Sequence, residues 1–234
     1  MKKKINQILL LNGGLGKRVK SISKNKPKCL IKFNQKSFLF WQLKFFKANG
    51  IKKVIICAGY KSQFILKELK KIKIKNLKIK VVVEKFPLGT GGAIKNCHNY
   101  LDDFFFVTYG DSWLNLKFKN IKNKFHRQNK KNMLCIISKN KIKNHKPNIL
   151  FKKDKIQNYQ KNNILFNYID YGLMLLSKKD IKKISKKKFD LSLLIKKLIQ
   201  SNLISVYKVR KKFYEIGSLQ GIKDFKRSFN YEIS

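Results

Sequence analysis

The feature that most constrains the fold is a glycine-rich loop placed directly after an apolar segment. Residues 8–11 read Ile-Leu-Leu-Leu, and Asn12-Gly13-Gly14-Leu15-Gly16-Lys17-Arg18 follows at once. A continuous apolar run of this kind is typical of a strand buried on both faces of a parallel sheet. Glycines let backbone N–H groups approach an anion closely, and the two cations supply countercharge. The sequence therefore predicts a phosphate-binding loop at the end of a first strand.

The loop matches neither of two common phosphate motifs. It lacks the G-x-x-x-x-G-K-[ST] spacing of a Walker A loop and the third glycine of a dinucleotide fingerprint. Lys28 sharpens the prediction, because Pro27 stiffens the chain before it and Cys29-Leu30-Ile31 can anchor the segment in the core. We expect Lys28 to be a fixed cation near the phosphates, and the alternative is one more lysine among many.

Strand-like and helix-like segments alternate through the first half of the chain. Strands are predicted over residues 5–11, 53–58, 77–83 and 104–108, and helices over 38–49, 62–72 and about 93–100. This alternation predicts an α/β fold with a Rossmann-like (GT-A-like), doubly wound sheet that is mixed but mainly parallel. Its functional loops follow the carboxyl ends of strands, where open α/β sheets bind ligands.

The second half is less regular. Strands are expected at 133–138, 168–176 and 203–209, a polar hairpin region up to about 163, and helices at 115–129, 178–184, 191–201 and from about 219. Asp190 is expected to be the N-cap of the helix that follows it. No linker rich in Pro, Gly or Ser interrupts the chain, so residues 1–234 are predicted to form a single domain.

The composition bounds the class of protein. The chain has 56 basic and 12 acidic residues among 234, a formal charge of +44, which raises the alternative of a nucleic-acid-binding protein. The lysines are spread over the whole chain beside abundant Asn and Ile, as AT-rich coding would produce, so compositional drift is favoured over a nucleic-acid surface. Four scattered cysteines without a C-x-x-C pair indicate a reducing cytoplasm. No apolar run is long enough to insert in a membrane.

A second glycine loop combines an acid with a turn. Glu84 is followed by Lys-Phe-Pro-Leu and then by Gly89-Thr90-Gly91-Gly92. Glycines here would let a flat base or sugar lie on the backbone, and the Glu84 carboxylate would accept hydrogen bonds from guanine N1–H and N2–H or from uracil N3–H. The alternative is a structural turn with a solvated glutamate.

Three further acids lie in apolar settings. Asp111 follows the strand ending near Thr108, where a carboxylate commonly holds Mg²⁺; the alternative is a helix N-cap. Glu215, before Ile216-Gly217, could bring a second carboxylate to the same metal. Asp170 must be paired if buried, and it would bind a sugar hydroxyl or a lysine. For Glu215 and Asp170, the alternative is a buried structural carboxylate.

Taken in order, these motifs resemble the sugar-1-phosphate nucleotidylyltransferase (NDP-sugar pyrophosphorylase) family. The resemblance covers residues 5 to about 228. It rests on Gly13-Gly14-Leu15-Gly16-Lys17-Arg18, Pro27-Lys28-Cys29-Leu30, Leu88-Gly89-Thr90-Gly91-Gly92-Ala93, Gly110-Asp111 and Glu215-Ile216-Gly217-Ser218.

The resemblance implies substrates, a cofactor and roles. An NTP would react with a sugar 1-phosphate by direct displacement, with Mg²⁺ as cofactor, in about residues 1–112 for the nucleotide and 113–234 for the sugar phosphate. Catalysis would rest on Arg18, Lys28 and Asp111, and metal binding on Asp111 and Glu215. Nucleotide binding would use Leu11, Asn12, Gly13, Gly14, Gly16, Lys17, Glu84, Gly89 and Thr90, and sugar binding would use Gly110, Asp170 and Gly172.

The chain also departs from the family pattern. Lys17 stands where Thr is usual, Cys29 replaces a proline, and Glu215 replaces Asp. If Glu215 cannot bind metal, a non-catalytic nucleotide-binding relative is the alternative. The short form and the E-x-x-P-L-G-T-G-G-A loop are most similar to heptose- or mannose-1-phosphate guanylyltransferases, slightly favoured over the short MurNAc-1-phosphate uridylyltransferases. Such an enzyme would serve cell-surface polysaccharide or lipopolysaccharide synthesis.

Overall fold

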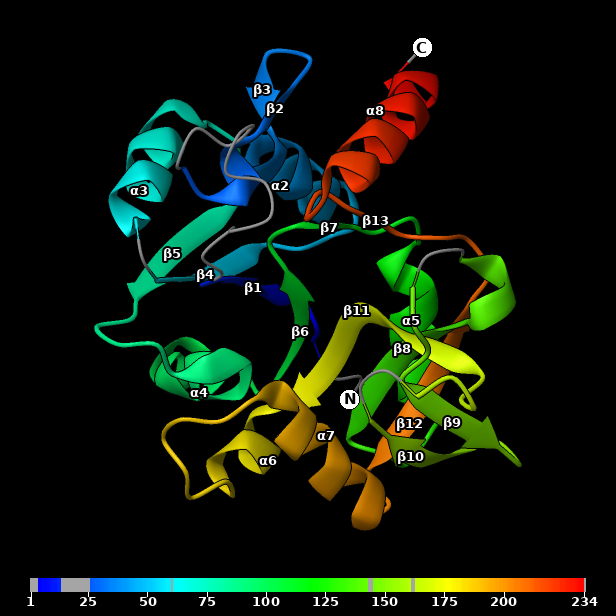
Figure 1. Cartoon of the computed structure of the whole chain (residues 1–234). Coiled ribbons are helices and arrows are strands. Elements are labelled where there is room, and N and C mark those ends of the chain that lie inside the picture. Colours follow the sequence, from blue (N-terminus) through cyan, green and yellow to red (C-terminus); the bar gives the residue numbers. More distant parts are fainter. Residues whose placement is uncertain (1–3, 14–25, 60, 143–144, 161–162, 234) are drawn as a thin grey trace.

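The central feature of the computed structural model is one nine-stranded sheet (Figure 1). The structure describes residues 4–13, 26–59, 61–142, 145–160 and 163–233. The strands of the sheet are β1 (Gln7–Asn12), β4 (Lys53–Ala58), β5 (Lys78–Val83), β6 (Phe104–Tyr109), β8 (Asn132–Ser138), β9 (Ile149–Lys152), β10 (Lys155–Tyr159), β11 (Tyr168–Ser177) and β12 (Ile204–Val209).

The strand order places the first strand at the middle of the parallel part. The main path runs β10-β9-β11-β6-β1-β4-β5, and β8 joins β11 to β12. β4, β1 and β6 are parallel neighbours, whereas β11 enters antiparallel to β6 and to β8. The chain moves from β1 to β4 and β5 and then returns to the other side of β1 as β6. The expected mixed, Rossmann-like α/β sheet of a single domain is therefore confirmed.

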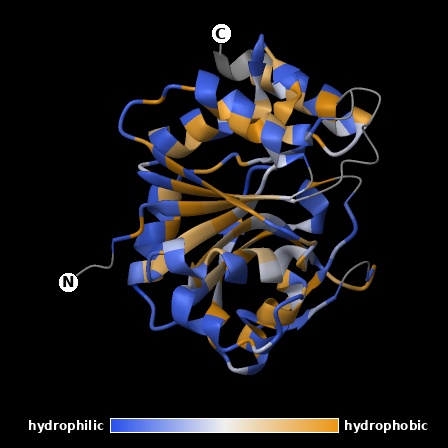
Figure 2. Cartoon of the chain, turned by 90° about the vertical axis from the view of Figure 1, so that its left-hand side faces the viewer, coloured by the Kyte–Doolittle hydropathy of each residue, from blue (hydrophilic) through white to orange (hydrophobic). Residues whose placement is uncertain are grey.

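Helices cover both faces of the sheet. α2 (Phe38–Ala48), α3 (Ser62–Lys71) and α5 (Phe118–His126) pack into one hydrophobic cluster, and α4 (Gly89–Asn96), α6 (Lys178–Lys182) and α7 (Leu191–Gln200) pack into the other. Hydrophobic positions concentrate on the strands between the helical layers (Figure 2). Within the described residues, no helix is long and apolar enough to cross a membrane.

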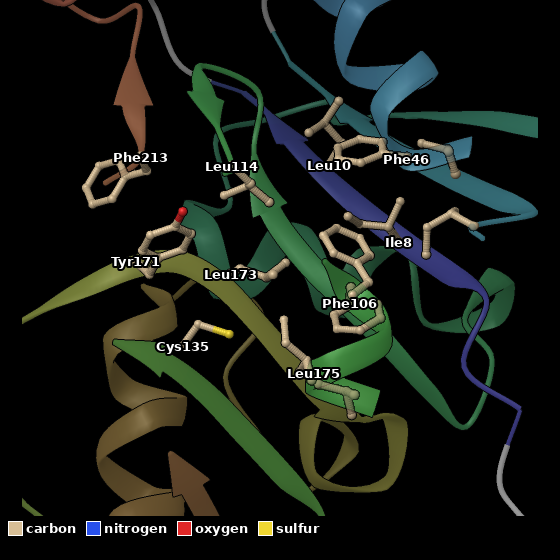
Figure 3. Packing of buried hydrophobic residues seen from close by; sticks show 14 of the residues in the cluster. Ile8, Leu10, Phe46, Phe106, Leu114, Cys135, Tyr171, Leu173, Leu175 and Phe213 are labelled. Carbon is tan, nitrogen blue, oxygen red and sulfur yellow. The ribbon is translucent and has the colours of Figure 1, made fainter. Parts of the chain in front are cut away.

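β1 is buried on both faces. Ile8 and Leu10 point into the cluster that also holds Phe106 of β6, and Leu9 belongs to the opposite cluster (Figure 3). Ile8, Leu9 and Leu10 have no exposed surface. This two-sided burial explains why an uninterrupted apolar run, rather than an alternating one, forms the strand.

A third cluster, made mostly of aromatic rings, attaches the C-terminal helix α8 (Leu219–Ile233). Phe225 of α8 lies edge-on against Phe33 and Phe38 and beside Trp113. The short elements around this cluster are η2 (Lys28–Leu30), β2 (Lys32–Phe33), β3 (Lys36–Ser37), β7 (Ser112–Trp113) and β13 (Tyr214–Glu215). η3 (His98–Tyr100) and η4 (Lys139–Lys141) lie outside it.

Two helix boundaries differ from the prediction. The helix expected at about 93–100 begins at Gly89 and ends at Asn96, so the glycine turn is itself its first turn. The helix expected at 115–129 spans only Phe118–His126, because Lys117 is extended and the Asn49 side chain accepts the Phe118 N–H. At Phe118 a tertiary contact marks the boundary, and such a contact leaves no trace in local periodicity.

Phe225→Ala should remove the centre of the aromatic cluster. Phe225 has no exposed surface and packs against five other rings, so we expect the free energy of unfolding to fall by about 3–5 kcal/mol. Urea unfolding followed by circular dichroism measures this loss. Phe40→Ala, at a half-buried ring of α2, is the control and should cost about 1 kcal/mol. Equal losses would contradict the central place of Phe225.

Candidate active site

A cavity of about 930 Å³ opens where β1, β4, β5 and β6 end. Because β4 and β6 lie on opposite sides of β1, these ends form the crevice in which open α/β sheets bind ligands. Its lining residues are Leu11, Asn12, Gly13, Pro27, Lys28, Gly59, Ser62, Val83, Glu84, Lys85, Phe86, Pro87, Gly89, Thr90, Ala93, Tyr109, Gly110, Asp111 and Asp190.

The cavity brings together most of the predicted site residues that the structure describes. Those lining it are Leu11, Asn12, Gly13, Lys28, Glu84, Gly89, Thr90, Gly110 and Asp111. Asp170, Gly172 and Glu215 are not among the lining residues. Gly14, Gly16, Lys17 and Arg18 lie outside the described residues.

Lys28 and Asp111 form an ion pair in the cavity wall. Lys28 Nζ lies 3.0 Å from Asp111 Oδ2, and the two side chains are 16% and 30% exposed. The short helix η2 fixes Lys28, because Leu30 N–H donates to the Pro27 carbonyl and the neighbouring Cys29 is buried. The expected anchored cation is thus present, and it faces a carboxylate.

The loop that carries Asp111 is clamped from two sides. The buried side-chain amide of Gln42 on α2 donates to the carbonyls of Tyr109 (3.1 Å) and Ser112 (2.9 Å). From the other side, Ile216 N–H donates to the Asp111 carbonyl at 2.9 Å. The Asp111 carboxylate therefore projects from a backbone that is fixed on both flanks.

Glu215 comes next to this loop through strand pairing. β13 pairs antiparallel with β7, and Glu215 lies opposite Ser112, the residue after Asp111. Asp111, in the turn before β7, and Glu215, in β13, carry carboxylate oxygens, the ligand type by which Mg²⁺ is usually held together with substrate phosphates. No larger group of potential metal ligands occurs in the described ranges. His145, which no motif had marked, lies 3.4 Å from Glu215 Oε2.

Much of the second glycine loop packs against other parts of the protein and is not open to a ligand. Gly91 and Gly92 N–H donate to the Phe189 carbonyl at 2.9 and 3.0 Å, and a Cβ at Gly91 would collide with the Phe189 ring. Gly89 has φ +73°, and a Cβ there would lie 2.6 Å from the same carbonyl. Of the four residues Gly89–Gly92, only Gly89 and Thr90 line the cavity, so the expectation of an open glycine surface holds for this part alone.

The expected N-cap at Asp190 is only half right. Asp190 occupies the N-cap position of α7 but makes no cap hydrogen bond with its side chain. Thr90 Oγ1 instead accepts the Leu191 N–H at 2.8 Å. Asp190 lines the cavity, a position that helix-start reasoning had missed.

Asp170 holds a bulge in β11. Its carboxylate accepts from Tyr159 OH at 2.9 Å and from Gly172 N–H at 2.8 Å, and its own N–H donates to Asn148 Oδ1. Gly172 has φ +78°, and the strand register shifts between Asp170 and Met174. Both carboxylate oxygens have protein partners, which favours the structural alternative for Asp170.

Acidic groups gather around Tyr109 at the end of β6. Burial raises the pKa of Tyr109 well above its usual range, and the negative charges of Asp170, Asp111, Glu215 and Asp190 raise that pKa further. These are four of only 12 acids in the whole chain. Tyr109 therefore stays a protonated hydroxyl on the cavity wall, and sequence patterns had given no sign of it.

Glu84 presents a buried acceptor to the cavity. No donor in the described part of the chain lies within hydrogen-bond distance of Glu84 Oε1. Burial raises the pKa of this carboxyl, while a hydrogen bond from the Leu88 backbone opposes the rise. A Cβ at Gly13 would lie 3.9 Å from both Glu84 oxygens, so the carboxylate borders the first glycine loop.

Comparison of the sequence with known proteins shows the family to which the chain belongs. A family model described as Nucleotidyl transferase matches residues 7–148. The D-glycero-alpha-D-manno-heptose 1-phosphate guanylyltransferase of Campylobacter jejuni is 40% identical over 116 residues, which cover 50% of this chain and 52% of that protein. A mannose-1-phosphate guanyltransferase of Aspergillus oryzae is 29% identical over 150 residues, covering 60% and 41%. The chain spans about half the length of these curated relatives.

A solved structure gives the same picture for the fold. HddC from Yersinia pseudotuberculosis superposes with a TM-score of 0.82 at 25% identity, covering 95% of this chain and 99% of that chain. The same protein complexed with GMP-PN gives a TM-score of 0.81 at 24% identity over equal shares.

Asp170 should make stability depend on pH. Burial raises the pKa of its carboxyl from the usual 3.8 to about 6, so the native state holds a proton that the unfolded chain releases. The stabilisation is complete below about pH 4 and is lost as the pH rises through about 6, a change of about 2–3 kcal/mol.

Urea unfolding of the wild type and of Asp170→Asn between pH 4 and 7 measures this contribution. The other carboxyls act alike in both proteins, so the difference between the two curves isolates Asp170. The wild type should lose stability relative to Asp170→Asn as the pH rises. Parallel curves would show that the native carboxyl is not protonated in this range.

Proposed function

Because this chain belongs to the nucleotidyl transferase family, we propose that it transfers a nucleotidyl group from an NTP to a sugar 1-phosphate, giving an NDP-sugar and pyrophosphate. The observation that carries the proposal is the Lys28–Asp111 pair, fixed in a cavity at the ends of β1 and β6. A cation and a potential metal ligand 3.0 Å apart, beside a glycine loop, suit a polyphosphate rather than a neutral ligand.

We propose GTP as the nucleotide and a heptose or mannose 1-phosphate as the acceptor. Two of the similar proteins are named as heptose- and mannose-1-phosphate guanylyltransferases. Glu84 Oε1, buried without a donor among the described residues, supports this choice because guanine offers two adjacent donors, N1–H and N2–H. The product would serve cell-surface polysaccharide or lipopolysaccharide synthesis. We place the reaction in the cytoplasm, where the four free, buried cysteines would stay reduced.

The two halves of the chain would divide the substrates. Residues 1–112 would hold the nucleotide, with the loop 12–18 and Lys28 on the phosphates and Glu84, Gly89 and Thr90 at the base. Residues 113–234 would hold the sugar phosphate beside Gly110 and the bulge at Gly172, which Asp170 fixes. The position of Tyr109 supports this division. Tyr109 lines the cavity, and its strand β6 lies between β1 of the first half and β11 of the second half.

The reaction is a direct displacement. A phosphate oxygen of the sugar 1-phosphate attacks the α-phosphorus of the NTP, and the bond to the bridging oxygen of pyrophosphate breaks. The nucleophile is already an anion, so no general base is required. Lys28, and Arg18 in the loop after β1, would neutralise charge on the phosphates and align them. Mg²⁺, when bound by Asp111 and Glu215, supplies Lewis-acid neutralisation of the phosphate charge.

Pyrophosphate release tests the proposal. Wild-type protein with Mg²⁺ should release pyrophosphate from GTP in the presence of a heptose or mannose 1-phosphate. Asp111→Ala should lower kcat/KM by about 1,000-fold, because it removes a carboxylate that would hold the phosphate-neutralising Mg²⁺. Lys28→Ala should lower it by about 100-fold, because it removes a fixed cation complementary to the reacting phosphates. Near-normal turnover by purified Asp111→Ala would contradict the assignment.

The control variant is Asp154→Ala. Asp154 is an exposed acid in the turn between β9 and β10 and pairs only with a surface lysine, Lys208, at 3.4 Å among the described residues. Its loss changes the net charge by the same amount as Asp111→Ala and should leave turnover within about twofold of wild type. Equal losses in both variants would point to a general charge effect instead of a site.

A further inference from the structure

An exposed phenylalanine lines the cavity two residues after the half-buried Glu84. Phe86 is 74% exposed, and Val83, at the end of β5, is 45% exposed. Both line the cavity, on either side of Glu84 in the chain. Large apolar side chains left in contact with water in the wall of a cavity indicate a surface that a ligand covers.

The backbone holds this segment in place. At one end Glu84 N–H donates to the Ala58 carbonyl at 2.8 Å, and at the other Phe189 N–H donates to the Leu88 carbonyl at 2.9 Å. Pro87 restricts the backbone of the residue before it, which is Phe86. The ring is therefore presented by a short segment tied to β4 and to the residue before α7.

The cavity that Phe86 lines has the chemistry of a site for a flat, polar-edged ring. The Gly59 and Gly13 backbones approach so closely that a Cβ on Gly59 would lie 3.4 Å from Gly13 Cα. Glu84 supplies an acceptor next to Gly13, and Phe86 and Val83 supply apolar surface. A nucleobase combines these properties, because its faces are apolar and its edge carries N–H donors.

We infer that Phe86, together with Val83, covers one face of the base of the bound NTP while Glu84 binds the edge. This inference rests on the proposed function, in which the base lies at Glu84. It assigns Phe86 the role of a positioning residue for the nucleotide, with no part in the transfer step. A purine offers a larger face to the ring than a pyrimidine, so Phe86 would favour GTP over UTP.

Phe86→Ala tests the inference in the full chain by pyrophosphate release. We expect the KM for GTP to rise about 5- to 100-fold, the range that one base–aromatic contact supplies, with a smaller change in kcat and in the KM for the sugar 1-phosphate. Phe86→Trp should restore the KM for GTP. Tyr100→Ala, which removes a 47% exposed ring away from the cavity, is the matched control and should leave both KM values within twofold.

A direct binding measurement separates this inference from the proposed function. In Phe86→Trp, GDP should quench tryptophan fluorescence beyond its effect on wild-type protein, which has Trp41 and Trp113 alone. Ribose 5-phosphate, which lacks a base, should not. If the wild type releases no pyrophosphate yet GDP quenches Phe86→Trp, the proposed function fails and the base contact stands. An unchanged KM for GTP in Phe86→Ala, or a rise confined to the sugar 1-phosphate, overturns the inference.

Discussion

Burial of β1 on both faces and pairing on both edges is the constraint on which the rest of the structure depends. Ile8, Leu9 and Leu10 have no exposed surface, and parallel neighbours flank the strand. Parallel strands end at the same edge of a sheet, so the loops after β1, β4, β5 and β6 meet. The cavity is a consequence of this arrangement, and its walls come from segments far apart in the sequence.

Local patterns predicted the parallel half of the sheet well. β4 spans the predicted residues 53–58, because an apolar run bounded by Lys53 and Gly59 has a clear start and end. Lys28, Glu84 and Asp111, which were predicted as site residues, all line one cavity. They could be predicted because Glu84 and Asp111 lie in loops after strands and Lys28 lies in an anchored segment. These features depend on residues that are close together in the sequence, so one sequence is enough to predict them.

Features made by distant contacts could not be predicted. The pairing of β7 with β13 joins Ser112 to Glu215, and strands of two residues have no periodicity to detect. The Thr90 hydroxyl takes the capping role expected of Asp190, because α4 and α7 meet in space. The pKa of Tyr109 is raised in part by four carboxylates, and these come from four separate segments of the chain. Asp170 lies in β11 and Glu215 in β13, whereas Asp111 directly precedes β7 and Asp190 directly precedes α7.

The Phe189 carbonyl accepts hydrogen bonds from the first turn of α4, and this contact affects where the cavity can bind an anion. A helix N-terminus attracts anions through its free N–H groups, but those of Gly91 and Gly92 already have a protein acceptor. α4 thus has little to offer a phosphate, although it begins with three glycines in four residues. Among the described residues that line the cavity, Lys28 supplies a cation and Glu84 supplies an acceptor oxygen without a donor. An elongated ligand with an anionic tail and a donor edge is therefore favoured in the direction that brings its tail to Lys28 and its edge to Glu84.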